Sequence, residues 1–133
     1  MIGLDTNLLV RYLTADDPVQ SPMAKRLIES LTQAEPGFIS LVVLVETHWV
    51  LRQTYHYGLE EVHRVIGSLL DAAEFTIDQA DLVRAALVEA AATAHELPDA
   101  LIAVGGTRAG CRSTYTFDKK ASALAGMELL TGS

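Results

Sequence analysis

The sequence lacks long apolar runs, paired cysteines and an excess of basic residues, and each absence excludes a class of protein. Apolar stretches such as residues 41–45 fall far short of the roughly 20 residues that a membrane-spanning helix needs. The single cysteine, Cys111, cannot form a disulfide within the chain, and the first residues lack the basic and long apolar segments of a signal peptide. We therefore expect a cytoplasmic protein that does not span a membrane.

Basic residues are outnumbered, because 10 Lys and Arg stand against 17 Asp and Glu and give a net charge of −7. A protein that holds nucleic acid over a broad surface usually has a basic face, so the composition argues against that mode of binding. It is compatible with a nucleic-acid enzyme whose acidic residues hold cations. An acidic chain also suits a basic partner protein.

Several catalytic signatures are also missing. The sequence contains no GxxxxGK[ST] or GxGxxG phosphate-binding motif and no GxSxG nucleophile motif. The four histidines, His48, His56, His63 and His95, have no metal-ligand spacing, and we expect them at the surface or at helix edges. Cys111 precedes an apolar strand and is expected to be a small buried hydrophobic residue.

Short strand-like segments alternate with helices along the whole chain. The strands are expected at residues 1–4, 38–39, 74–77, 113–117 and 127–130, and the helices after Asp5 and at residues 19–34, 41–57, 59–70, 78–95, 98–108 and 119–125. This alternation predicts an α/β sandwich with a mostly parallel sheet. The 133 residues suffice for one domain, 1–133, with a single core.

Two carboxylates follow directly on predicted strands. Asp5 ends the segment MIGL, and Asp118 ends the segment STYTF. Either residue could simply be the N-cap of a following helix, a position that favours Asp. Both would nevertheless lie beyond the carboxyl ends of parallel strands, where such sheets bind ligands.

Glu46 lies in the middle of the helix that is predicted to follow Ser40. Its neighbours three and four positions away are all apolar, so we expect its side chain on the buried face. These neighbours are Val42, Val43, Trp49 and Val50. A buried carboxylate needs a cation, which could be Arg11 or Arg52 in an ion pair, or a metal ion.

Asp99 follows Pro98 in the first turn of another predicted helix. A negative charge at this position is favourable by about 0.3–1 kcal/mol, which could by itself explain the residue. Ile102 and Ala103 share its helical face, however, so its side chain is also expected to point inward.

Each of the four carboxylates therefore has a structural explanation, but their common placement suggests a site. Acidic residues that converge on one end of a sheet offer the oxygen ligands that Mg²⁺ or Mn²⁺ prefers. The members are Asp5, Glu46, Asp99 and Asp118. Without a metal, burial and mutual repulsion should raise the pKa of at least one of them.

Four segments, GLDTNLLVRYL, LVVLVETHWVLRQTY, LPDALIA and TYTFDKKASALAGMELL, resemble the PIN-domain ribonucleases, in particular the VapC toxins of bacterial toxin–antitoxin pairs. The resemblance implies a five-stranded sheet in the order 3-2-1-4-5 flanked by helices. It places the acidic, metal-binding and catalytic site on Asp5, Glu46, Asp99 and Asp118. It also gives Thr6, Asn7 and Thr116 supporting roles in orienting a ligand or water.

The activity implied by the resemblance is endonucleolytic cleavage of RNA with Mg²⁺ or Mn²⁺. The resemblance also implies a VapB-like antitoxin as a partner, and the apolar content of the chain and the stretch Val104-Gly105-Gly106 favour a homodimer. Two other functions stay open: an aspartate-based phosphoryl-transfer domain, such as a receiver or a phosphatase, and a non-catalytic PIN module. Gly105 and Gly106 depart from the family pattern, and close packing against the sheet or a partner subunit would explain them.

Overall fold

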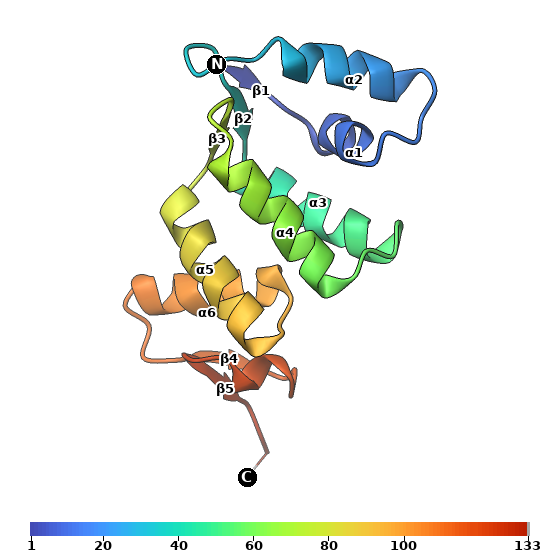
Figure 1. Cartoon of the computed structure of the whole chain (residues 1–133). Helices are drawn as coiled ribbons and strands as arrows, with labels where there is room; N and C mark the ends of the chain where they lie inside the picture. The colour runs from blue at the N-terminus through green and yellow to red at the C-terminus, as the bar shows by residue number, and fades with distance from the viewer. Residues whose placement is uncertain (133) are drawn as a thin grey trace. The chain divides into compact units, whose positions relative to one another are not determined.

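The computed structural model describes residues 1–132, which divide into two compact units (Figure 1). The N-terminal unit is Met1–Ala80, and the C-terminal unit begins at Asp81. Strands alternate with helices in both units and all strand pairs are parallel, so the predicted α/β class is confirmed. In the part of the chain that is described, no helix is both long and apolar enough to cross a membrane.

The N-terminal unit holds a three-stranded parallel sheet in the order β1-β2-β3, with Gly37 paired to Ile2 on one side and to Phe75 on the other. Its strands are β1 (Ile2–Gly3), β2 (Gly37–Ile39) and β3 (Phe75–Ile77), and its helices are α1 (Thr6–Thr14), α2 (Gln20–Glu29), α3 (Leu41–Gln53) and α4 (Leu59–Asp71). Helix α1 packs against α2 and α3, and α3 packs against α4. The most buried side chains of this unit come from the helices and from the sheet. They include Leu9, Ile39, Leu44, Leu51, Val62 and Ile66.

Local hydrogen bonds explain where the helices of this unit begin and end. The Ser40 hydroxyl accepts from the backbone N–H of Val43 at 3.1 Å, which confirms the predicted cap of α3. Helix α2 ends well before the predicted residue 34, because Thr32 and Glu35 close a turn through two hydrogen bonds. Helix α3 likewise ends at Gln53 rather than at residue 57, and His56 beyond it has a left-handed φ of 57°.

The C-terminal unit contains two helices and a parallel pair of strands. Its elements are α5 (Ala80–Thr93), α6 (Leu97–Arg108), β4 (Thr114–Thr116) and β5 (Met127–Leu129), with a short 3-10 helix at Ala121–Ala123 where the sequence predicts a helix over residues 119–125. Strands β4 and β5 pair with Thr114 opposite Met127. The expected strand order 3-2-1-4-5 agrees with the two sheets that are present, β1-β2-β3 and β4-β5. The pairing of β1 with β4, which would join them into one five-stranded sheet, stays a prediction.

The expectation that all four histidines lie at the surface or at helix edges is wrong for three of them. His48, His63 and His95 are buried, and His56 alone is exposed. His48 and His63 lie on the buried faces of α3 and α4, while the His95 ring is held at 2.9 Å from the Thr93 hydroxyl and 2.8 Å from a backbone carbonyl. An imidazole with a hydrogen-bond partner is readily buried, and spacing alone does not reveal such a partner.

Cys111 is exposed rather than buried, which also corrects the sequence-based expectation. It lies in the loop after α6, directly beyond Gly110, whose φ of 92° turns the chain before β4 begins at Thr114. The apolar strand that suggested burial therefore starts only after the cysteine.

The two glycines near the end of α6 differ in what surrounds them. A Cβ on Gly106 would overlap the hydroxyl of Thr114 on β4, whereas a Cβ on Gly105 would have no neighbour within 4 Å. Close packing against the sheet, one of the two expected explanations, therefore holds for Gly106. It does not account for Gly105.

We expect Gly106→Ala to destabilise the protein by about 1–3 kcal/mol, because the added methyl group overpacks the contact with β4. Gly105→Ala is the matched control and should stabilise by about 0.5–1 kcal/mol, the ordinary helix preference for Ala over Gly. Urea unfolding of both variants measures the difference, and Thr114→Ala should remove the penalty of Gly106→Ala. A destabilising Gly105→Ala would instead reveal a second surface packed on that glycine.

Candidate functional site

Asp5 occupies the N-cap position of α1, but its carboxylate does not act as a cap. The residue has extended backbone angles and its carbonyl accepts the N–H of Leu9 at 3.1 Å, while its side chain makes no capping hydrogen bond. The side chain is exposed. Helix capping therefore does not account for a carboxylate at the end of β1, and its two oxygens are available to a ligand.

Glu46 lies on an exposed face of α3, so the prediction that it is buried is wrong. The buried face of this helix is formed by Leu44, Thr47, His48 and Leu51. Helix α3 is apolar on nearly all sides, and its exposed face includes Val42, which is 69% exposed. Apolar neighbours therefore could not identify the buried side of this helix.

A hydrogen bond from Thr6 fixes the orientation of Glu46. The Thr6 hydroxyl donates to Oε1 of Glu46 at 2.7 Å and so joins the first turn of α1 to α3. The expected ion pair with Arg11 does not form, because the acidic partner of Arg11 is Asp16, at 3.7 Å. Glu46 is therefore positioned by a neutral hydroxyl donor on an exposed face of the helix.

Asp5, Thr6, Asn7 and Glu46 line one pocket of about 450 Å³ between α1 and α3, called here the acidic pocket. Tyr55, just beyond the end of α3, forms part of its wall. A sheet-end carboxylate and a helix carboxylate thus share one pocket within the N-terminal unit. The sequence predicts both acids but gives no role to Tyr55, which has no distinguishing spacing.

In the C-terminal unit, Asp118 has a structural role as well as a candidate catalytic one. Its Oδ1 accepts the N–H of Ala121 at 3.0 Å, as a capping side chain would, although the residue directly before the 3-10 helix is Lys120. Its own N–H donates to the Thr116 hydroxyl at 3.0 Å. Thr116 therefore supports the turn that presents the Asp118 carboxylate at the end of β4.

Asp99 lies in the first turn of α6, as predicted, and is half-buried. Burial raises the pKa of the Asp99 carboxyl above its ordinary value, and the negative charges of Asp118 and Glu96 raise that pKa further. The predicted upward shift is thus confirmed for one member of the quartet. Its helical neighbour Ile102 is 55% exposed, so the expectation that this whole face points inward is wrong.

The donor set fits a hard divalent cation. Each unit supplies a pair of carboxylates, and burial together with the charge of Asp118 raises the pKa of Asp99. Carboxylate oxygens are the ligands that Mg²⁺ and Mn²⁺ prefer. Among residues 1–132, no three His, Cys, Asp or Glu side chains are grouped as a metal site, so the structure presents the acids as two pairs.

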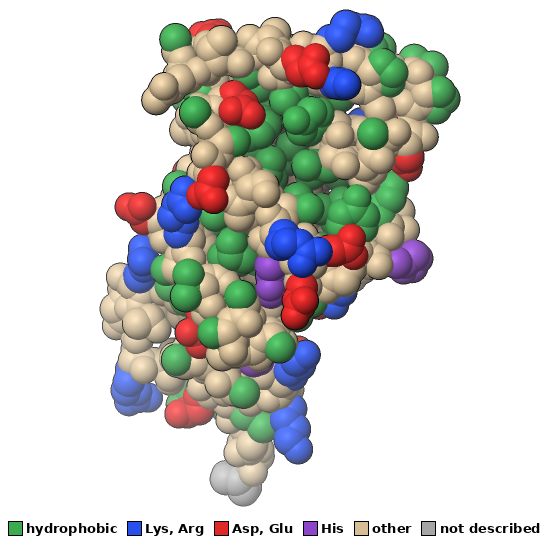
Figure 2. Space-filling model, viewed as in Figure 1, with side chains coloured by type: hydrophobic (Ala, Val, Ile, Leu, Met, Phe, Trp, Pro, Cys, Tyr) green, Lys and Arg blue, Asp and Glu red, His purple; other side chains and the backbone are tan. Residues whose placement is uncertain are grey.

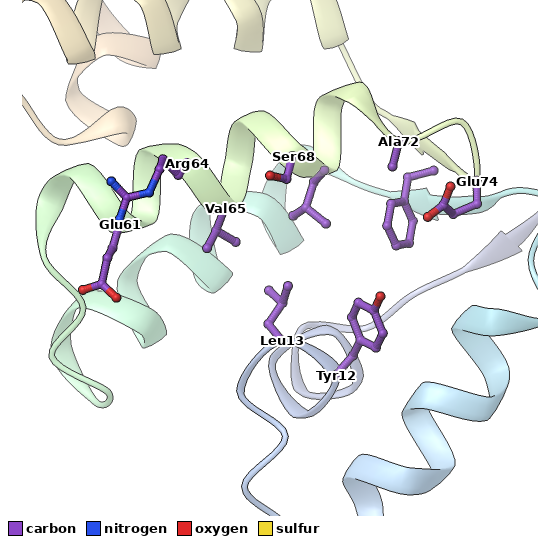
Figure 3. Close-up of a pocket in the computed structure, with 10 residues that line it drawn as sticks. Tyr12, Leu13, Glu61, Arg64, Val65, Ser68, Ala72 and Glu74 are labelled. Atoms are coloured by element: carbon purple, nitrogen blue, oxygen red, sulfur yellow. The ribbon is translucent and has the colours of Figure 1, made fainter.

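A different hollow in the N-terminal unit has no such chemistry. Hydrophobic side chains gather in it between α1 and α4 (Figure 2). Tyr12 and Leu13 face Val65 across the hollow, with Glu61 and Glu74 toward its two ends (Figure 3). None of its lining residues lines the acidic pocket, and its two carboxylates lie apart, so we assign it no part in the chemistry.

One comparison with known proteins identifies a family for this chain. The model of the PIN domain family matches residues 2–127, a range that includes both acidic pairs. A comparison with curated proteins found no match.

Proposed function

Because the chain belongs to the PIN-domain family, whose members are generally nucleases, we propose that it is a metal-dependent endoribonuclease. We further propose that it is the toxin of a VapBC-type toxin–antitoxin pair and acts in the cytoplasm. The observation that carries the nuclease proposal is the acidic pocket of about 450 Å³, which Asp5 at the end of β1 and Glu46, held by Thr6, line together. Such a pair favours a bound cation.

We propose that all four carboxylates act in one reaction, in a single PIN domain of residues 1–133 with a five-stranded sheet. Asp5, Glu46, Asp99 and Asp118 would hold one or two Mg²⁺ or Mn²⁺ ions. The support is that the family match spans all four positions, that Asp5 makes no capping bond, and that Glu46 is held by Thr6. A bound divalent ion would supply positive charge to the phosphate and lower the pKa of water.

The chain's own residues would contribute orientation and proton transfer. Thr6 donates to Oε1 of Glu46 and Thr116 accepts from the backbone N–H of Asp118, so the two threonines would help to position these acidic residues. Asp99 is the best candidate for a general base, because its raised pKa lies closer to neutral pH than that of an ordinary carboxylate. Attack by water, rather than by the ribose hydroxyl, would leave a 5′-phosphate and a 3′-hydroxyl.

The proposed partners follow from charge and family. An acidic chain with a net charge of −7 suits an antitoxin that brings a basic side chain to the carboxylates and competes with the metal. A homodimer is the second proposed partner, and the support for it is the apolar content of the chain, 50% of its residues.

Cleavage of RNA by the purified chain tests the proposal. We expect cleavage in Mg²⁺ or Mn²⁺ that EDTA abolishes and added metal restores, because carboxylates do not themselves offset the phosphate charge and a divalent ion held by them would. Products are identified by their 5′-phosphate ends. Cleavage that persists in EDTA contradicts the metal requirement. Metal-independent RNA binding without cleavage supports a non-catalytic module, and labelling of Asp5 by acetyl phosphate supports phosphoryl transfer.

A further inference from the structure

One face of α1 separates the acidic pocket from a second pocket. Asn7 and Arg11 are four residues apart and so lie on the same face of the helix. Both line the acidic pocket, and both also line a pocket of about 500 Å³ between α1 and α2, called here the α1–α2 pocket. Asp5 lines both pockets as well. A ligand that crosses α1 at this face would therefore reach the candidate catalytic carboxylates and the α1–α2 pocket together.

Arg11 is the one basic residue that lines either pocket. Its Nε donates to Oε1 of Gln20 at 2.9 Å, and its Nη1 donates to the Tyr55 hydroxyl at 3.2 Å and lies 3.7 Å from Asp16. These contacts hold the guanidinium in place and leave Nη2 out of all of them. Its side chain is 27% exposed, so a fixed, partly accessible cation stands beside the acids.

The α1–α2 pocket combines an apolar wall with amide groups. Leu8, Met23 and Leu27 supply the wall, and Asn7 and Gln20 supply the amides. Because Oε1 of Gln20 already accepts from Arg11, the N–H donors of its amide are left to face a ligand. The volume lies in the roughly 300–1,000 Å³ range of small-ligand pockets.

We propose that the α1–α2 pocket binds one nucleotide of the RNA, next to the scissile phosphate. Its base lies against Met23 and Leu27, its edge accepts from the Gln20 amide, and its phosphate binds Nη2 of Arg11. This inference rests on the proposed ribonuclease function, because it supplies the substrate contact that the acids themselves cannot make. Contact with the edge of one base would also allow the chain to prefer certain RNA sequences.

The chemistry favours a nucleotide over other occupants. Sequence-specific RNA binding usually places an unstacked base in a pocket with hydrogen bonds to its edge. A guanidinium is the preferred side chain for phosphate recognition, since its planar donors match phosphate oxygens. In a chain with a net charge of −7, a single anchored arginine beside the acids gives the backbone a defined place to bind.

Binding of a labelled single-stranded RNA to the full-length chain in Ca²⁺, measured by anisotropy over a series of KCl concentrations, tests the subsite. Arg11→Gln should make the slope of log K against log[salt] shallower by about 0.7, the loss of one phosphate contact in a single strand. Arg11→Lys should keep that slope. Arg26→Gln is the matched control, because it also removes one positive charge, at an exposed position on α2. It should leave the slope unchanged.

A second variant tests the base-binding wall without disturbing the contacts of Arg11. Met23 is 57% exposed, so Met23→Glu should fold normally and should weaken RNA binding at least about tenfold through repulsion and loss of the apolar surface. Val19→Glu, at a position that is 67% exposed, is its control. Gln20→Ala should relax the base preference at one position when cleavage of a randomised RNA pool is sequenced.

The outcomes separate this inference from the proposed function. If the wild type cleaves RNA but Arg11→Gln and Met23→Glu behave like their controls, the subsite is overturned and the nuclease stands. If the wild type cleaves nothing, the nuclease proposal fails, and the salt slopes of Arg11→Gln and Arg26→Gln still decide the binding site. If Met23→Glu instead disrupts only the complex with a protein partner, the pocket belongs to that partner and the nucleotide assignment is wrong.

Discussion

Replacing any one of the four carboxylates by its amide should lower RNA cleavage by about 10²-fold or more. The substitutions are Asp5→Asn, Glu46→Gln, Asp99→Asn and Asp118→Asn. Each removes a negative charge from the group that would hold the metal and leaves the transition-state charge less well balanced. Initial cleavage rates of a labelled RNA in Mn²⁺ measure the loss, and growth arrest on expression should disappear in parallel.

Amide substitutions are suitable because they preserve the hydrogen bonds that the structure shows. Gln at position 46 keeps an oxygen that can accept from Thr6. Asn at position 118 keeps the oxygen that caps Ala121, and Asn is as good a capping residue as Asp. Asp5 makes no capping bond at all. A large loss of activity can therefore be assigned to the missing charge rather than to a disturbed fold.

Two carboxylates outside the pairs provide matched controls. Asp81 lies in the first turn of α5, as Asp99 does in α6, and Glu29 is an exposed helical glutamate like Glu46. Asp81→Asn and Glu29→Gln should retain wild-type activity. If a variant of one of the four carboxylates cleaves as fast as these controls, that carboxylate has a structural role and is not part of the catalytic site.

In the absence of metal, Asp99→Asn should melt at a higher temperature than the wild type at about pH 8, and the difference should shrink toward about pH 5. Burial and the charges of Asp118 and Glu96 raise the Asp99 pKa, so the folded protein binds this proton more tightly than the unfolded chain. The resulting stability is fully present below the unfolded pKa of about 4 and is lost as pH rises through the raised folded value. The neutral amide avoids that loss.

Added metal should reverse the order of the two melting temperatures, so that the wild type melts higher than Asp99→Asn. A ligand at a hundredfold excess over its dissociation constant stabilises the folded state by about 2.7 kcal/mol, and the wild type should gain this from Mn²⁺. Asp99→Asn should gain much less, because one ligand or its charge is missing. Thermal melts of both proteins with EDTA and with Mn²⁺, at each pH, give the comparison.

The control for these melts is Asp81→Asn, whose carboxylate is exposed and should show neither effect. A lower melting temperature of Asp99→Asn in EDTA at about pH 8 would mean that the charge of Asp99 stabilises the helix N-terminus more than burial and repulsion destabilise it. Asp99 would then be a structural residue, and the electrostatic argument for a cation beside it would not hold.

Much of the architecture follows from the sequence because it depends on local signals. Ser40 before an apolar helix, Pro98 near the start of α6 and the break at Gly58 each act within a few residues, and all three mark helix boundaries in the structure. Parallel pairing follows from the alternation of strands and helices. The existence and order of the elements were therefore predictable, while several helix ends were shortened by turns such as the one closed by Thr32 and Glu35.

The sequence by itself also determined which four carboxylates are candidates, because each stands where its polarity breaks an apolar pattern or ends a strand. Only the tertiary structure decided their environments. It left the Asp5 side chain without a capping bond and exposed Glu46 on a helix that is apolar on nearly every side. It also raised the Asp99 pKa, by partly burying the carboxyl and by placing Asp118 nearby. Burial and long-range hydrogen bonds depend on which faces pack together, and a one-dimensional pattern does not contain that information.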